Sequence, residues 1–212
     1  MTSASSFSML SEERQRKLFE AVKRHFASHR TDGLHDIDHT VRVTRWVEIL
    51  SEKEHADKSL TIPAAILHDI ARPLSGEKDH AAEGALLCKT FLRETGYDKS
   101  DISKISKIVA VHSISGKNQP ETLEAKILFD GDKLDGVGPI GLCRLLLDYI
   151  NKGNTISEAA KKSVDFIKFW KGKYGNPPFF TETAKGIAKK KMRLHGRTLA
   201  RSERRHWEIE NI

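Results

Sequence analysis

The 212-residue chain is predicted to be an all-α protein. Apolar residues recur at the three- and four-residue spacing of amphipathic helices, and no stretch sustains the alternation typical of β-strands. Serine, aspartate and glutamate stand where these stretches begin, whereas glycine or proline stands where they end. These three observations predict a bundle of helices.

The N-terminal half of the chain is predicted to contain five helices. Ser11 is the expected N-cap of the first, which ends near residues 29–30. His39 lies in the first turn of the second helix, and Pro63 lies in the first turn of the third, where its missing N–H is tolerated. The third, fourth and fifth helices cover residues 59–70, 80–94 and 101–112.

The C-terminal half is predicted to contain three amphipathic helices and one long basic helix. They cover residues 122–136, 140–150, 155–170 and 181–207. Residues 185–205 include nine Lys and Arg residues and one acid, a net charge of +8, whereas the whole chain carries +7. We expect the basic helix to face solvent, a second copy of the chain in a homo-oligomer, or an anion.

The composition predicts a cytoplasmic protein with one sizeable domain. No apolar run approaches the ~20 residues that a membrane span requires. Residues 1–10 are Ser-rich and lack a signal-peptide pattern, so we expect them to be disordered and residues 11–212 to form one bundle. Cys88 and Cys143 are expected to be reduced core residues.

Within residues 64–72, an apolar run ends in His68-Asp69. Arg72, Pro73 and Gly76 come after this pair and are predicted to stop the helix. Runs of this kind are buried in cores. A carboxylate at the end of one is costly to bury unless it is paired or binds a metal. His68 and Asp69 are therefore predicted to hold a divalent cation at the inner end of a core helix.

Histidine and aspartate residues also stand at the ends of other predicted helices. The candidate set is His39, His68, Asp69, His80, His112 and Asp132. Imidazole and carboxylate together suit Mn, Fe, Co, Ni or Zn, whereas Mg prefers carboxylate and water. Ligands from several helices leave open coordination positions, as in a catalytic site. The expected orienting partners are Asp36, Asp130 and Asp135.

The order of these residues resembles the HD superfamily of metal-dependent phosphohydrolases, whose metal motif runs His…His-Asp…Asp. The segments 35–43 (HDIDHTVRV) and 130–144 (beginning DGDKLD) are similar to those of small stand-alone HD proteins. Gly131 stands where many relatives carry alanine. The resemblance covers residues 33–148, leaves 155–207 as an extension, and implies a single HD-type helical bundle. The metal ligands that it implies are His39, His68, Asp69 and Asp132.

The resemblance implies hydrolysis of a nucleotide-like phosphate or pyrophosphate ester by a metal-activated water, with one or two ions. Asp69 then acts both as a ligand and in steering the water. In some family members, residues like His80 and His112 supply a second metal site or contact phosphate. Together with Lys133, they are expected to stabilise developing charge or to protonate the leaving oxygen.

Each of these residues also has a structural alternative. His39 suits a helix cap, whereas His80 and His112 suit ordinary surface hydrogen bonds. Asp130 is the alternative to Asp132 as the last ligand. The arginines expected to bind substrate phosphate, or instead to anchor a carboxylate, are Arg42, Arg72 and Arg144.

Two other activities compete with phosphohydrolysis. Inositol oxygenase uses the same helical fold with two irons, so a di-iron oxygenase remains an alternative. The basic helix suggests a nucleic-acid-binding module, but this helix lacks interleaved aromatic residues and any known motif. A purely structural HD domain is disfavoured because every expected ligand position is filled. The expected partner is a small phosphate compound, and a nucleotide fits best.

Overall fold

The computed structural model describes residues 12–29, 32–75, 80–113, 119–174 and 179–192. The described residues form helices and no strands, so the protein is all-α as predicted. The helices are α1 (Glu13–Ala27), α2 (Ile37–Lys53), α3 (Lys58–Leu67), α4 (Arg72–Ser75), α5 (His80–Glu94), α6 (Lys99–Ala110), α7 (Leu123–Asp135), α8 (Pro139–Asn151) and α9 (Ile156–Tyr174). Residues 182–192 are also helical.

The chain forms two compact units, Met1–Asp132 and Lys133–Ile212, and their boundary falls within α7. The prediction of one bundle over residues 11–212 remains a prediction. In the described part of the chain, no helix is both long enough and apolar enough to cross a membrane.

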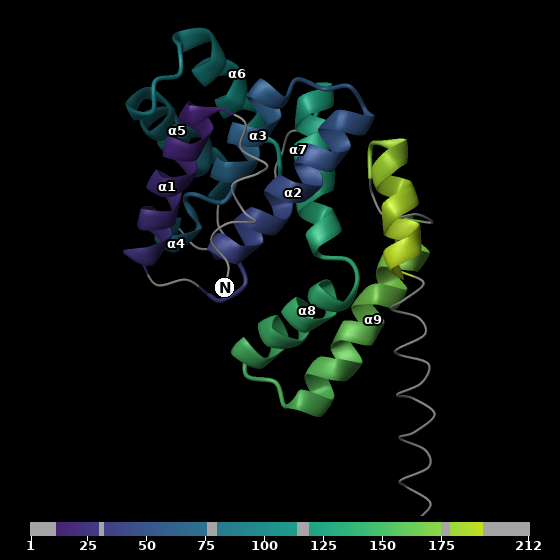
Figure 1. Cartoon of the computed structure of the whole chain (residues 1–212). Helices are drawn as coiled ribbons and strands as arrows, with labels where there is room; N and C mark the ends of the chain where they lie inside the picture. Colours follow the sequence, from purple (N-terminus) through teal and green to yellow (C-terminus); the bar gives the residue numbers. More distant parts are fainter. Residues whose placement is uncertain (1–11, 30–31, 76–79, 114–118, 175–178, 193–212) are drawn as a thin grey trace, which may run out of the picture. The chain divides into compact units, whose positions relative to one another are not determined.

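Helix α3 is the centre of the first unit. Eight of its ten residues are buried, and it packs against α1, α2 and α6. Figure 1 shows α3 among these neighbours, while α5 packs beside α6. A helix that is apolar on all sides is expected in the middle of a core. The residues that directly follow α3 therefore lie in the interior of the first unit.

The boundaries of α3 differ from those predicted. Asp57 caps the helix by accepting a hydrogen bond from Ser59 N, so the helix begins at Lys58 and Pro63 is its sixth residue rather than part of its first turn. A proline there removes one backbone hydrogen bond, and the buried surface of α3 offsets this loss. The helix also ends at Leu67, and α4 forms where the sequence predicted only a stop.

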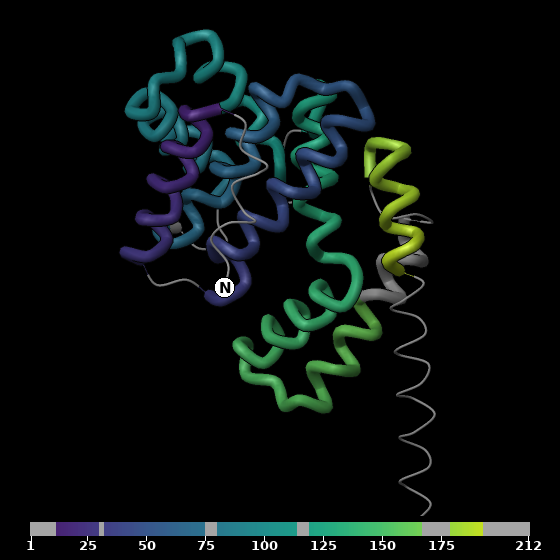
Figure 2. The backbone as a smooth tube through the Cα atoms, viewed as in Figure 1, coloured from purple at the N-terminus to yellow at the C-terminus, as the bar shows by residue number. Residues whose placement is uncertain are grey.

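The second unit contains α8 and α9, which pack against each other after a short turn (Figure 2). Lys191, in the helix of residues 182–192, donates from Nζ to the Leu134 carbonyl at 2.6 Å. The predicted long basic helix is described only to residue 192, and the rest lies outside the described residues. Cys88 is buried as predicted, whereas Cys143, predicted to be a core residue, is exposed on α8.

Candidate metal centre

His68 and Asp69 lie in the turn that directly follows α3. The His68 side chain is fully buried, and that of Asp69 is 3% exposed. A buried carboxylate is strongly unfavourable unless hydrogen bonds, cations or a metal compensate for the lost water. The surroundings of Asp69 provide such groups, because four imidazoles and one guanidinium converge on it.

The first histidine pair faces Oδ2 of Asp69. His39 Nε2 lies 3.5 Å from this oxygen, and His68 Nε2 lies 3.4 Å from it. The two Nε2 atoms are 3.2 Å apart. Asp132 joins this group, because its Oδ1 lies 3.5 Å from His39 Nε2. All four residues belong to the first unit.

The second histidine pair faces the other oxygen of the same carboxylate. His80 is the first residue of α5, and His112 follows the end of α6 by two residues. Their Nε2 atoms lie 3.8 and 3.5 Å from Asp69 Oδ1. Arg72 also approaches this oxygen, with its Nε at 3.4 Å. Asp69 is thus shared between two pairs of buried imidazoles.

Helix ends fix the orientation of two of the imidazoles. His68 Nδ1 lies 2.8 Å from the Ala65 carbonyl, and His112 Nδ1 lies 2.7 Å from the Val109 carbonyl. A carbonyl only accepts, so each Nδ1 carries a proton and donates it. In the neutral ring, Nε2 then presents its lone pair to the centre, which is the usual arrangement of a metal-binding histidine.

Burial alone would raise the pKa of Asp69, yet the pKa lies well below its ordinary value. The charge of His68 and hydrogen bonds from His112, His39 and His68 outweigh the loss of water. Asp69 is therefore an anion at neutral pH. Without a metal, protons on the imidazole Nε2 atoms stabilise this anion. A divalent ion that displaces these protons would meet the carboxylate and the Nε2 lone pairs together.

The donor set fits a divalent metal. Two ligand atoms bound at about 2.0–2.2 Å to one ion lie roughly 3.0–3.5 Å apart, and the distances among His39, His68 and Asp69 are 3.2–3.5 Å. A second group, made by Asp69, His80 and His112, is also compact enough to hold an ion. The described residues therefore offer two adjoining groups of donors that share Asp69.

The remaining predicted residues lie outside these groups. Asp130 is fully buried in α7, and Arg42 is half-buried in α2. Arg144 Nη1 donates to Asp135 Oδ2 at 2.7 Å, so this arginine anchors a carboxylate in the second unit. Lys133 follows Asp132 in α7 and also belongs to the second unit. The roles predicted for these residues stay predictions.

The sequence did not indicate the two carbonyls that orient His68 and His112. Each belongs to the residue three positions before the histidine, and such a partner leaves no side-chain signal. His35 was also missed as a neighbour of the centre. Its ring packs edge-on against His39, with centroids 5.6 Å apart, and its Nδ1 lies 2.7 Å from Asp32 Oδ2. The aspartate three residues before His35 is the signal that predicts this pair.

Comparison with known proteins identifies the family. Residues 36–136 match the model of the HD domain. A predicted HD superfamily hydrolase from an uncultured Thermotogales bacterium is 28% identical, with a TM-score of 0.66, and the match covers 90% of this chain and 91% of that one. The structure of Bacillus subtilis YpgQ in complex with ADP is 22% identical, with a TM-score of 0.68, over 91% of this chain and 94% of that one.

Two curated proteins also match part of the chain. YpgQ of Bacillus subtilis (strain 168), described as uncharacterized, is 24% identical over 57% of this chain, and ribonuclease Y of Sulfurovum sp. (strain NBC37-1) is 22% identical over 60%. These matches span 60% of YpgQ and 24% of ribonuclease Y. The matched domain, the shared fold and the histidine-aspartate cluster at its centre together show that the chain belongs to the HD superfamily.

Proposed function

We propose that the protein is a metal-dependent phosphohydrolase that acts on a nucleotide-like phosphate or pyrophosphate ester. One observation carries this proposal: the buried Asp69 carboxylate is shared by four imidazoles, two of which are oriented by backbone carbonyls. A purely structural histidine cluster does not require so many lone pairs around one anion. A centre that holds one or two divalent ions does.

The proposed ligands of the first ion are His39, His68, Asp69 and Asp132. Asp69, His80 and His112 either hold a second ion or contact the substrate phosphate. A bound divalent ion supplies Lewis acidity, which makes water a stronger acid and neutralises charge on a phosphoryl oxygen.

Arg72 is proposed to bind the substrate phosphate. Its Nε donates to Asp69 at 3.4 Å, which leaves the Nη groups of the guanidinium for a phosphate oxygen. Where no second ion is bound, His80 or His112 is proposed to give a proton from Nε2 to the leaving oxygen. The related protein YpgQ was crystallised with ADP, which supports a nucleotide as the substrate of this chain.

The first prediction concerns activity and metal content together. Protein loaded separately with Mn, Fe, Co, Ni, Zn or Mg is expected to release phosphate or pyrophosphate from members of a nucleotide panel. His68→Ala is expected to lose metal and at least about 100-fold in activity, because even residues that only support a ligand change these quantities by 10–100-fold. Elemental analysis and a phosphate-release assay measure the two effects.

His55→Asn is the matched control, because His55 is exposed and has a left-handed backbone conformation that asparagine tolerates. It should bind metal and hydrolyse nucleotides as the wild type does. Failure of every metal-loaded form to release phosphate or pyrophosphate would contradict the proposed activity. Normal metal content in His68→Ala would contradict the ligand assignment alone. A visible iron chromophore in aerobic protein would favour the oxygenase alternative.

A further inference from the structure

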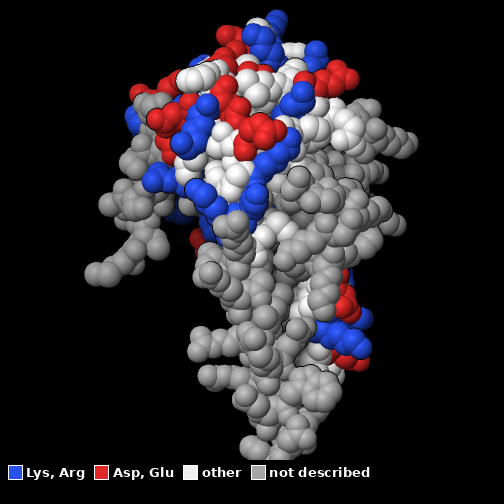
Figure 3. All heavy atoms as spheres, turned by 90° about the vertical axis from the view of Figure 1, so that its right-hand side faces the viewer, with Lys and Arg blue, Asp and Glu red and all other residues white. Residues whose placement is uncertain are grey.

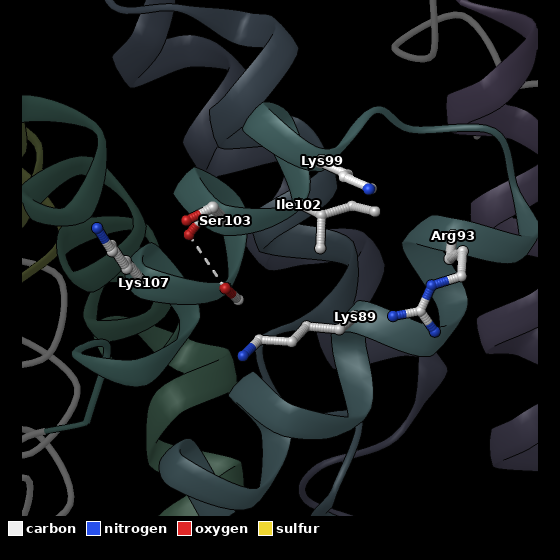
Figure 4. Close-up of a pocket in the computed structure, with 7 residues that line it drawn as sticks. Lys89, Arg93, Lys99, Ile102, Ser103 and Lys107 are labelled. Atoms are coloured by element: carbon white, nitrogen blue, oxygen red, sulfur yellow. Dashed lines mark hydrogen bonds between the residues drawn. The ribbon is translucent and has the colours of Figure 1, made fainter.

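A pocket lined by residues of α5 and α6 has a volume of about 420 Å³. Figure 4 shows Lys89 and Arg93 on one side and Lys99 and Lys107 on the other, with Ile102 between them. Four of its seven lining residues are therefore cations, and none is acidic. The pocket does not include any residue of the candidate metal centre.

These four cations make no ion pair within the described part of the chain. On the face shown in Figure 3, in contrast, basic and acidic side chains lie next to one another. The nearby Asp101 does not compensate the pocket, because it pairs with Arg14 at 3.4 Å. Like charges repel when they gather without an anion. The positive charges of the four cations are thus not paired with an acidic side chain of the described residues.

The helix geometry arranges the cations in two rows. Lys99, Ser103 and Lys107 are spaced by four residues on α6, and Lys89 and Arg93 are spaced by four on α5. Residues four apart lie on one helix face with a rise of about 6 Å. Two facing rows with this spacing suit an anion that carries several negative groups in line.

The two cations of α5 lie away from the metal centre along that helix, whereas Lys107 of α6 precedes His112 by five residues. Lys89 and Arg93 follow His80 by nine and thirteen residues in the same helix. This separation corresponds to about 13 and 20 Å along the helix axis. The two sites also use different faces of α5, because the core-facing residues include Cys88 and Leu92, which directly precede the two cations.

We propose that this pocket binds a short polyphosphate anion, such as inorganic pyrophosphate, triphosphate or the phosphate chain of a nucleotide. Such groups carry about three to four negative charges near pH 7, which matches four cations. The volume falls in the range of small-molecule sites. Ile102 is the one lining residue with an apolar side chain, so the charged contacts of the site come from the four cations.

Binding is tested by isothermal titration calorimetry of the full chain with inorganic triphosphate in EDTA, so that no divalent ion occupies the metal centre. The wild type is expected to show saturable binding at one site, which weakens as salt is raised. The variant Lys89→Gln/Lys107→Gln should bind about tenfold more weakly for each cation removed. Titration with pyrophosphate and with a nucleoside triphosphate then shows whether the phosphates alone suffice.

The matched control is Lys104→Gln, which removes an exposed lysine of α6 that does not line the pocket. It should bind triphosphate as the wild type does. Three results would overturn the proposal: no binding by the wild type, unchanged binding by the double variant, or an equal loss in the control. Tighter binding of a single-stranded RNA oligomer would overturn the assignment to a small anion.

The melting temperature of each variant shows whether weaker binding reflects the lost cations or a loss of folding. Because the substituted lysines make no ion pair, the double variant should melt at a temperature no lower than that of the wild type. An inactive wild type would contradict the proposed hydrolase activity but would leave the binding result intact.

Discussion

Gly131 is a residue at which the smallest possible side chain matters. A Cβ added there would lie 2.6 Å from Val47 Cγ2 and 3.3 Å from Val47 N. Val47 is fully buried and stiff at χ1, so it cannot easily move aside. Gly131→Ala should therefore lower the free energy of unfolding by about 1–2 kcal/mol, because overpacking outweighs the gain of about 1 kcal/mol in helix propensity. Urea denaturation measures this change.

A double-mutant cycle with Val47→Ala isolates the contact. In the Val47→Ala background, Gly131→Ala should be neutral or stabilising, since the obstructing methyl group is gone. The same loss in both backgrounds would show that the close approach to Val47 is not the cause. A loss seen only in the presence of Val47 would show that alanine at position 131 requires a change in its neighbour.

At the scale of an element, the first turn of α2 connects helix capping to the metal centre. Asp36 is the N-cap, and its Oδ1 accepts a hydrogen bond from His39 N at 2.8 Å. We expect Asp36→Ala to cost about 1 kcal/mol of stability and about tenfold in metal affinity, because residues that position a ligand affect binding to this extent. Denaturation and metal titration measure the two effects.

Asp36→Asn is the informative comparison, because asparagine caps helices as well as aspartate does. It should retain both stability and metal binding. If Asp36→Ala binds metal as tightly as Asp36→Asn, the cap does not help to position His39. The sequence predicts an aspartate N-cap for this helix, which Asp36 provides, and also predicts that Asp36 orients an imidazole. The structure shows the Asp36 carboxylate accepting from the backbone N–H of His39 instead.

The helices that carry the centre show what a sequence can predict. Apolar spacing and caps predict most helices to within a few residues, and the order His39, His68-Asp69, Asp132 predicts which residues meet. The start of α3 is predicted to within one residue, but Pro63 lies in the body of the helix rather than in its first turn, because buried surface outweighs the local preference of proline. The division of the Asp69 oxygens between two histidine pairs depends on how α3, α5 and α6 pack. Local sequence patterns do not contain that information.

At the scale of the whole molecule, metal binding should raise thermal stability. An ion that binds only the folded state at one hundred times its Kd adds about 2.7 kcal/mol, or roughly 5–10 °C for a chain of this size. Imidazoles bind metals in the neutral form, and their ordinary pKa is about 6.5. The rise in melting temperature with Mn should therefore shrink as the pH falls from 7.5 to 5.5.

Differential scanning calorimetry with Mn or EDTA at each pH measures this rise. His68→Ala provides the control, and it should show little change with Mn at any pH. An equal rise in the wild type and in His68→Ala would mean that the ion binds elsewhere. A rise that stays constant down to pH 5.5 would argue against histidine ligands.

The shared carboxylate of Asp69 limits how this protein can diverge. A descendant can replace His80 and His112 and still keep a complete group of donors around the other oxygen. It can equally lose a donor at His39 or His68 and still keep the group formed by Asp69, His80 and His112. Replacing Asp69 by a residue without side-chain oxygens, in contrast, removes a donor from both groups in one step. Substitutions are therefore expected to accumulate first at the histidines, whereas Asp69 is expected to tolerate the fewest substitutions.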